Sequence, residues 1–323
     1  MSWLRSLQSK GKGKAKASGS APPYPLPGTD APPAWQAAPE EMHADGLRSE
    51  APEADWHAGE AFCAAHPPDP PRLLPSADVE RIRAHGCGAW RLAAPDPARF
   101  RGRLANGGAP GKHGVVAVES AADCPETVLL SDLPLLAGLY DTRGQPGVYF
   151  EVKVLRMDDE AVVAVGTACR PYPPFRLPGW NRLSAGLHLD DVRKFFEDPS
   201  GGQTYAPGSA LARAGRAAAG DTVGVGFAWA TGALFFTHNG ARLPDAYLGA
   251  YAPRAAHDVY AAVGVAGPGV CALEVNFGAR EFEWKEGNDW KVQAHVGMMP
   301  GGGGVEDELP SYSAARRDRR VDA

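Results

Sequence analysis

The stretch GDTVGVGFAWATGALFFTHNG, residues 220–240, decides the fold class of this chain. Val223, Val225 and Phe227 alternate with two glycines, and a spacing of two places the three apolar side chains on one face of a β-strand. The glycines leave the opposite face bare, so a large aromatic ring or a second backbone can approach it closely. The stretch therefore predicts a strand in a β-sandwich scaffold.

Two turn dipeptides, Thr231-Gly232 and Asn239-Gly240, punctuate this stretch. Asn-Gly between apolar runs is the strongest short-range signal for a β-hairpin. Because the stretch carries no catalytic group, it favours a sandwich that binds a partner over an enzyme.

The composition excludes several classes of protein. The 323 residues carry a net charge of -5, with a pI near 6.0, so nothing attracts the whole chain to nucleic acid. The five cysteines are widely scattered and form no CxxC pair, which argues against a zinc site or a disulfide framework and predicts a reducing, cytoplasmic compartment. We expect no cofactor and no metal. No run of about 18 apolar residues is present, so we see no transmembrane helix.

The chain divides into three predicted regions. Residues 1–75 hold 13 of the 30 prolines and are expected to be disordered and rich in Pro and Ala. Residues 76–285 form the sandwich with an N-terminal extension, and 286–323 form a flexible, Gly-rich and charged tail. Residues 1–16 place an apolar cluster before four lysines, which is typical either of weak contact with an anionic membrane surface or of a solvated basic terminus.

The predicted secondary structure is mostly β. A short helix is expected over residues 76–86, with Ser76 as its cap, Gly86 at its exit, and Val79 and Ile82 on its apolar face. The Ala- and Arg-rich segment 211–219 is expected to be a loop insertion. The candidate strands are Ala89–Leu92, Val115–Val118, Val128–Leu130, Val148–Leu155, Ala161–Thr167, Ser184–Leu189, Val192–Phe195, Thr222–Ala228, Ala233–His238, Val259–Val265 and Ala272–Phe277.

One of these strands alternates clearly. Its pattern predicts that Phe150, Val152 and Val154 face inward, whereas Glu151 and Lys153 face outward. Many short strands separated by Gly, Pro and Asn are typical of an antiparallel sandwich.

Seven sequence blocks, in their order and spacing, resemble the SPRY domain. They are VYFEVKVL (148–155), VGTACRPYPPFRLPGW (165–180), LHLDDVRKFF (187–196), GDTVGVGF (220–227), LFFTHNG (234–240), VYAAVGVAGPG (259–269) and EVNFG (274–278). The resemblance implies an all-β fold, a bent antiparallel β-sandwich whose loops bind partner proteins. It also implies no catalytic residues.

The sequence is most similar to a subgroup of fungal SPRY proteins, the adaptors of WW-domain HECT ubiquitin ligases at endosomes and vacuoles. RPYPPFRLPGW (170–180) and IRAHGCGAWRLAAPDPARF (82–100) carry this likeness, which extends it to residues 79–285. Three features depart from the subgroup. Val192 stands where the family usually has Gly, the segment 209–219 is longer than usual, and the membrane span typical of these adaptors has no counterpart in the sequence.

The subgroup implies a ligand for WW domains, which bind a polyproline-type Pro-Pro-x-Tyr peptide. Leu309-Pro310-Ser311-Tyr312 fits the variant of this motif with Leu in the first position. Pro22, Pro23 and Tyr24 offer a weaker match, and Pro32-Pro33-Ala34-Trp35 has Trp in place of Tyr. Proline and tyrosine can also meet by chance in a biased tail, and that alternative stays open.

A proline-stiffened loop offers a second candidate binding surface. Tyr172, Pro174, Phe175 and Arg176 belong to it, and rigid aromatics lose little entropy on binding. The alternative is that the aromatic side chains pack inward and cap the sandwich, which we favour for Trp180.

The paired aspartates after a predicted strand, Asp190 and Asp191, complete the candidate partner-binding loops. Together with His188 they also resemble metal ligands or a His–Asp base, but a metal site needs more converging ligands. A structural role at a strand end is favoured for this group.

Signals for an enzyme are otherwise missing, because GxSxG, HExxH and GxxxxGK[ST] motifs do not occur. An enzyme would require His188, Asp190 and His238 to converge in a cleft. The sequence therefore predicts a non-catalytic adaptor that joins a cargo protein to a WW-domain ubiquitin ligase. The alternative is a SPRY scaffold or substrate-receptor module, similar to Ran-binding protein M, with no ligase-recruiting tail.

Overall fold

The computed structural model describes residues 53–107 and 114–300. The α-helices in these ranges are α1 (Glu53–Ala65), α2 (Ser76–His85) and α3 (Ala210–Ala214), and the 3-10 helices are η1 (Gly86–Ala89), η2 (Arg254–Ala256) and η3 (Lys285–Asp289). The strands are β1 (Gly102–Asn106), β2 (Val115–Ser120), β3 (Thr127–Leu130), β4 (Leu136–Ala137), β5 (Gly147–Met157), β6 (Val162–Cys169), β7 (Ser184–His188), β8 (Arg193–Phe196), β9 (Gln203–Thr204), β10 (Thr222–Ala228), β11 (Ala233–His238), β12 (Ala241–Tyr247), β13 (Asp258–Ala266) and β14 (Cys271–Asn276).

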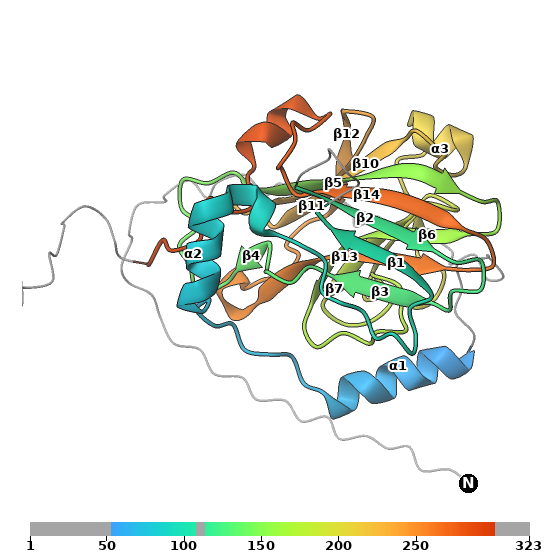
Figure 1. Ribbon diagram of the computed structural model, residues 1–323, viewed down its shortest axis with the longest axis horizontal. Coiled ribbons are helices and arrows are strands. Elements are labelled where there is room, and N and C mark those ends of the chain that lie inside the picture. The colour runs from blue at the N-terminus through green and yellow to red at the C-terminus, as the bar shows by residue number, and fades with distance from the viewer. Residues whose placement is uncertain (1–52, 108–113, 301–323) are drawn as a thin grey trace, which may run out of the picture. The chain divides into compact units, whose positions relative to one another are not determined.

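Two antiparallel sheets pack face to face (Figure 1). The first sheet has the strand order β1-β2-β14-β5-β10-β11-β12. The second has the order β3-β13-β6-β7-β8-β9, with β4 paired to β13. The predicted all-β antiparallel sandwich is therefore confirmed.

The core between the sheets follows the period-two pattern of the strands. On β10, Val223, Val225 and Phe227 are buried in the main hydrophobic cluster. On the neighbouring β5, Phe150 and Val152 belong to the same cluster and are 0% exposed. The inward face predicted for each strand is confirmed.

The glycines of β10 lie on the other face of the first sheet and leave room for aromatic rings. A Cβ atom at Gly226 would lie 2.1 Å from Cζ of Phe235, and one at Gly224 would lie 1.9 Å from the hydroxyl oxygen of Tyr149. Both rings therefore rest directly on the backbone of β10, as the sequence predicts for paired glycines.

A C-terminal segment that carries Phe282, Trp284 and Trp290 covers these rings. Phe282 meets Tyr149 edge-on with ring centroids 4.8 Å apart, and Trp284 meets Phe235 at 5.3 Å. Glu151, which we expected to face solvent, points away from the core but is only 4% exposed. Its carboxylate accepts hydrogen bonds from the backbone N–H groups of residues 283 and 284, at 3.0 and 3.1 Å.

The predicted tail begins later than expected, because residues 286–300 pack on the sandwich. Val292 and His295 are both 0% exposed. His295 Nε2 accepts a hydrogen bond from the backbone N–H of Ala137 at 3.0 Å, and its ring lies 4.8 Å from that of Trp229. Burial lowers the pKa of His295 to about 3.

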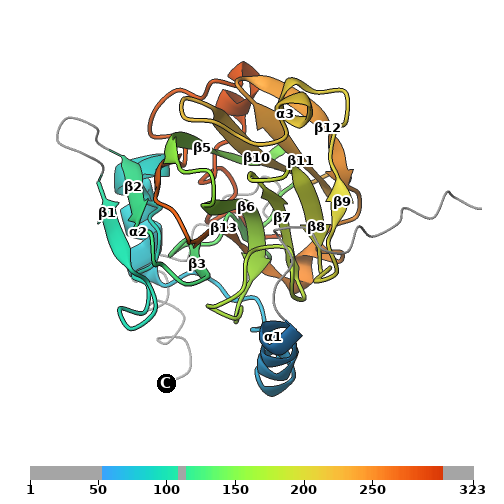
Figure 2. The ribbon, with the colours of Figure 1, turned by 90° about the vertical axis from the view of Figure 1, so that its right-hand side faces the viewer.

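The second sheet is covered on its outer face by the loop that joins β6 to β7. A Cβ atom at Gly264 would meet the side chains of Leu177 and Pro178, each at 2.7 Å. Trp180 packs with Leu177 and Phe195 in a separate buried cluster. Helix α1 lies beyond this loop, so the sheets stand between α1 and the C-terminal segment in both views (Figures 1 and 2).

Helix α1 contradicts the prediction that all of residues 1–75 are disordered. Residues 53–65 are helical, and Gly59 and Cys63 are buried against the sandwich. Residues 1–52 lie outside the described ranges, as do 301–323. The short helix predicted at 76–86 is confirmed as α2, with Gly86 at its exit, but its N-cap is Pro75 and Ser76 makes no capping bond.

Most predicted strands are present. One predicted strand is absent, and four polar or short strands were not predicted. The strand expected over Ala89–Leu92 is wrong, because η1 ends at Ala89 and Leu92 makes only an isolated bridge to Ser131. Part of the expected loop at 211–219 is helical in α3. The sequence pattern does not predict β1, β4, β9 or β12.

The contact between Gly226 and the Phe235 ring leads to a stability prediction. Gly226→Ala inserts a methyl group where the ring already lies, and such overpacking costs about 1–3 kcal/mol. Gly208→Ala is the matched control, because a Cβ there meets no atom within 4 Å. Urea unfolding should show a clear loss for the first variant and none for the second, and equal stability of the two variants would contradict the close packing.

Candidate functional site

The loop of residues 171–182 is held in shape by the hydroxyl group of Tyr172. Tyr172 is only 6% exposed. Its hydroxyl donates a hydrogen bond to the carbonyl of Leu177 at 2.6 Å and accepts one from the backbone N–H of Asn181 at 3.3 Å. Burial raises the pKa of Tyr172 well above its usual range. This side chain therefore organises the loop and is not free to touch a partner.

Arg176 belongs to the same loop, and its side chain is buried. It is 0% exposed, its Nε donates to Oδ1 of Asn181 at 2.9 Å, and its guanidinium lies 4.5 Å from the ring centroid of Trp180. Burial lowers the pKa of this arginine. Its Nη1 and Nη2 atoms are also buried and have no hydrogen-bond partner among the described residues.

Glu126 supplies a carboxylate that interacts electrostatically with this guanidinium. Its Oε2 atom is buried without a hydrogen-bond partner in the described part of the chain. Burial raises the pKa of Glu126 to about 7, against the opposing effect of Arg176. The site thus holds an arginine and a glutamate in a poorly solvated setting, where each new polar contact matters more than in water.

Only two members of the predicted loop surface are accessible. Pro174 is exposed, and Phe175 is half-buried. The Phe175 ring contacts the Arg99 guanidinium at 5.3 Å and meets the ring of Phe62, on α1, edge-on at 6.3 Å. The structure therefore corrects the predicted surface, because Tyr172 and Arg176 face inward while Phe175 contacts the chain's own helix.

His188 binds the backbone of the 171–182 loop from the second sheet. It lies on β7, is 0% exposed, and its Nε2 lies 3.1 Å from the carbonyl oxygen of Pro178, to which it donates in the neutral form. Its ring packs 4.1 Å from that of Phe195. Burial lowers the pKa of His188 to about 3, so it is a neutral structural residue at pH 7.

The convergence that an enzyme would require is not present. His188 is enclosed in the second sheet, whereas His238 lies on β11 of the first sheet. His238 Nε2 lies 3.1 Å from Oδ1 of Asp221. Within residues 53–107 and 114–300, no group of three or more His, Cys, Asp or Glu side chains has the arrangement of a metal site.

Asp190 lines a separate hollow between the loops at one end of the sandwich. This hollow has a volume of about 600 Å³, and Asp159, Glu160 and Arg216 also line it. The side chain of Asp159 is fully exposed, and Arg216 Nη1 donates to its Oδ1 at 3.2 Å. The acidic rim suits a partner segment that offers hydrogen-bond donors or positive charge.

The turn after Asp190 is strained. Asp191 Oδ1 accepts a hydrogen bond from the backbone N–H of Arg193 at 3.1 Å, which closes the turn. Val192 has φ 58, a left-handed conformation that suits glycine and is an outlier for a β-branched residue. Val192 nevertheless keeps its side chain in the core, where it is 2% exposed. The turn therefore keeps the backbone conformation that Gly would adopt at this position.

Several residues of the site were not predicted from the sequence. Glu126, Asn181 and Arg182 are polar residues in loops, where no periodicity marks an inward side chain. The motif residues Leu309, Pro310 and Tyr312 lie outside the described residues, and so do Pro22, Pro23 and Tyr24.

All five cysteines are free and buried. No helix within the described ranges is long and apolar enough to span a bilayer.

Known proteins resemble the region around this site. The SPRY domain family matches residues 147–280. A SPRY domain-containing protein of Schizosaccharomyces pombe is 34% identical over 170 residues, which are 52% of this chain and 38% of that protein. Protein ssh4 of Sclerotinia sclerotiorum is 33% identical over 153 residues, 47% of this chain and 26% of its own length.

The likeness to one further relative extends beyond the family match. Protein ssh4 of Neurospora crassa is 26% identical over 263 residues, which are 80% of this chain and 46% of that protein. The chain therefore spans less than half the length of these relatives.

The buried His188 leads to a prediction about pH. The folded pKa of about 3 lies below the ordinary value of 6.5, so the unfolded state binds a proton that the folded state rejects. The stability contributed by neutral His188 is complete above pH 6.5 and is lost as the pH falls toward 3, by about 1.4 kcal/mol per pH unit.

His188→Gln removes this titration and keeps an amide donor for Pro178. Between pH 7.5 and 5.0, urea unfolding of the wild type should lose about 2 kcal/mol more than the variant. Other titrating groups are common to both proteins and cancel in the difference. Parallel pH profiles would show that His188 is not buried in its neutral form.

The strained turn leads to a second prediction. Ala ordinarily stabilises a chain relative to Gly by about 0.4–1 kcal/mol, but at positive φ the order reverses. Val192→Gly and Val192→Ala both lose the buried side chain, so their comparison isolates the backbone. We expect the Gly variant to be at least as stable as the Ala variant in chemical denaturation. A more stable Ala variant would mean that the turn does not hold this φ.

Proposed function

Residues 147–280 of this chain form a SPRY domain, and on that premise we propose that the chain is a non-catalytic adaptor for protein sorting. In this proposal the SPRY domain binds a cargo or partner protein. The segment Leu309–Tyr312 recruits a WW-domain HECT ubiquitin ligase, which then modifies the cargo. The family match carries the proposal, because a SPRY domain is a protein-interaction fold.

The form of the sandwich supports a binding role for its loops. The C-terminal segment covers the outer face of the first sheet, and the 171–182 loop covers that of the second. A partner therefore meets loops rather than the open face of a sheet. Pro174, Phe175 and the hollow beside Asp190 are the accessible parts of the predicted surface.

Two binding sites on one chain would act through effective concentration. A cargo bound at the sandwich and a ligase bound at the tail meet at a local concentration that the connecting chain sets, in the millimolar range for short flexible linkers. Weak binding at each site is then sufficient for transfer of ubiquitin to the cargo. The relatives named ssh4 share the SPRY region with this chain. That this chain binds a ligase and a cargo protein is our proposal.

The same proposal gives the place of action. Ubiquitin-dependent sorting would bring this chain to endosomal or vacuolar membranes through its partners, with weak surface contact through residues 1–16. The alternative is a SPRY scaffold or substrate-receptor module in another protein complex, similar to Ran-binding protein M, in which the tail is passive.

Tyr312 is the residue to test. Tyr312→Ala removes the ring that fills the tyrosine pocket of a WW domain, and we expect at least a tenfold loss of affinity. A pull-down of the full chain against a panel of WW domains measures this loss. Ser311→Ala is the matched control, because the third position of the motif is variable.

Two outcomes would contradict the ligase half of the proposal. One is unchanged WW binding in Tyr312→Ala. The other is that the wild-type chain binds no WW domain, in which case deletion of residues 301–323 should also leave its protein partners unchanged. Either result would leave the SPRY scaffold as the function.

A further inference from the structure

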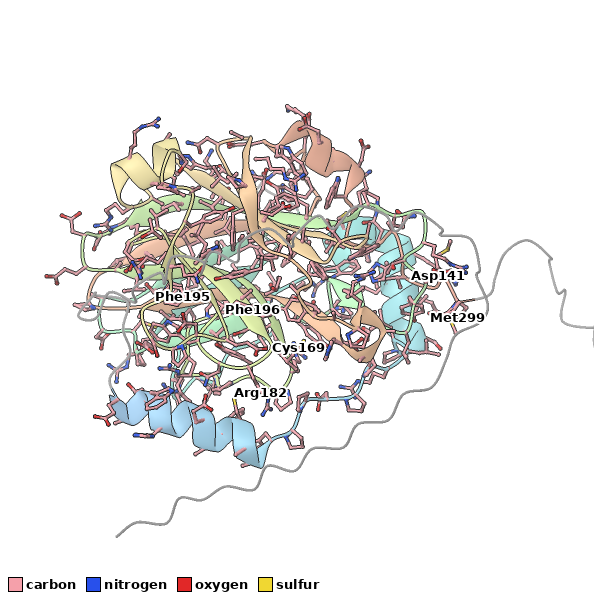
Figure 3. All side chains as sticks on the ribbon, turned by 180° about the vertical axis from the view of Figure 1, so that it is seen from behind. Asp141, Cys169, Arg182, Phe195, Phe196 and Met299 are labelled. Carbon is pink, nitrogen blue, oxygen red and sulfur yellow. The ribbon has the colours of Figure 1, made fainter. Side chains whose placement is uncertain are left out.

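Helix α1 is docked on the 171–182 loop by polar contacts toward its C-terminal end. Asn181 Nδ2 donates to Oε1 of Glu60 at 2.9 Å. The guanidinium of Arg182 donates to the carbonyl oxygens of Cys63 and His66, at the C-terminal end of the helix. Figure 3 shows Arg182 immediately above this end of α1. An arginine is favourable there because the last carbonyls of a helix lack partners within it.

The loop lies so close to helix α1 that the facing position of the helix has room only for a small residue. A Cβ atom at Gly59 would lie 2.9 Å from Oδ1 of Asn181 and 3.2 Å from Nε of Arg176. Gly59 and Cys63 are the buried residues of α1. One turn along, Phe62 meets the edge of Phe175. The surface thus fits a helix with a small residue, an acid directly after it, and an aromatic three positions after the small residue.

This docking is shallow. Most residues of α1 are exposed, and Trp56 leaves 38% of its surface in solvent. A helix of 13 residues is marginal in water without tertiary contacts. The helix and its docked position therefore depend on a few rim contacts, so a competing helix has little to displace.

Beneath α1, the guanidinium of Arg176 has N–H groups that could still donate hydrogen bonds. Its Nη1 and Nη2 atoms are buried and make no hydrogen bond within the described ranges. Three carboxylates interact electrostatically with it, those of Glu126 and of Asp55 and Glu60 on α1. A buried cation without bidentate partners gains strongly from a well-placed carboxylate. A partner helix whose acid reaches these nitrogens would bind better than α1 does.

We propose that Phe175, Arg176, Asn181 and Arg182 form a docking groove for an acidic amphipathic helix of a partner protein, with α1 as its tethered occupant. The partner exchanges with α1 and pairs its carboxylate with Arg176. This inference names the partner class for the SPRY loops and rests on the proposed function only for the identity of the cargo. Its test needs neither ligase nor cargo.

Displacing α1 within the full chain tests the groove. Gly59→Leu places a side chain against Asn181 and Arg176 while raising the helix propensity of α1. Ala61→Leu adds the same side chain at an exposed position and is the matched control. The probe is a fluorescein-labelled peptide of residues 53–69, and its affinity for each full-length chain is measured by fluorescence anisotropy.

The Gly59→Leu chain should bind this peptide about tenfold more tightly than the wild type or Ala61→Leu, because its groove is free of the tethered competitor. Adding Arg182→Gln to Gly59→Leu should abolish the gain. A peptide with Asp55→Asn, which removes a carboxylate that interacts electrostatically with Arg176, should bind more weakly than the unmodified peptide.

Three outcomes would overturn the proposal. Equal affinity in all three chains would mean that α1 does not occupy a binding groove. Peptide binding that survives Arg182→Gln would place the peptide elsewhere. Concentration-dependent dimers of Gly59→Leu in light scattering, without a gain in peptide affinity, would assign the groove to a second copy of the chain. None of these readouts depends on Tyr312, so this inference and the ligase proposal fail separately.

Discussion

The rest of this structure depends on the direct contact between aromatic rings and the glycine backbone of β10. Gly224 and Gly226 have no side chain on the outer face of the first sheet, and Tyr149 and Phe235 lie in the space that a Cβ would take. Because the rings lie so close to the sheet, their outer edges form a platform for Phe282, Trp284 and Trp290. A strand with two larger residues here would lift the rings and detach the C-terminal segment.

The second sheet follows the same rule with a different covering element. A Cβ atom at Gly264 would meet Leu177 and Pro178, and one at Gly186 would meet the carbonyl oxygen of Pro178 at 2.3 Å. The 171–182 loop therefore lies against bare backbone and buries its own aromatic side chains. This explains why an exposed-looking, proline-rich loop supplies the buried Tyr172 and Trp180. On top of this layer, Phe175 and Arg182 contact α1.

The sequence predicts the elements whose pattern is local and fails where burial is decided by distant segments. Asn239 and Gly240 have φ 49 and 76, as an Asn-Gly hairpin requires, yet β12 was missed because Pro244 and the bulges in its pairing break the alternation. Helix α1 was missed because its composition matches a disordered segment. The inward positions of Arg176 and Glu126 have no signal, since no period applies in a loop.

The C-terminal segment and helix α1 are attached to the sandwich by different physical means, and this difference determines which of the two is released more easily. The C-terminal segment is fixed by buried rings and by Glu151, which accepts two backbone hydrogen bonds inside the protein. Breaking those contacts would expose large apolar surfaces, which is costly. Helix α1 is held by polar contacts at its rim and buries only small residues, so its release exposes little apolar surface. Local opening therefore begins at the α1 end, because the free energy of local unfolding is lowest where few apolar contacts are lost.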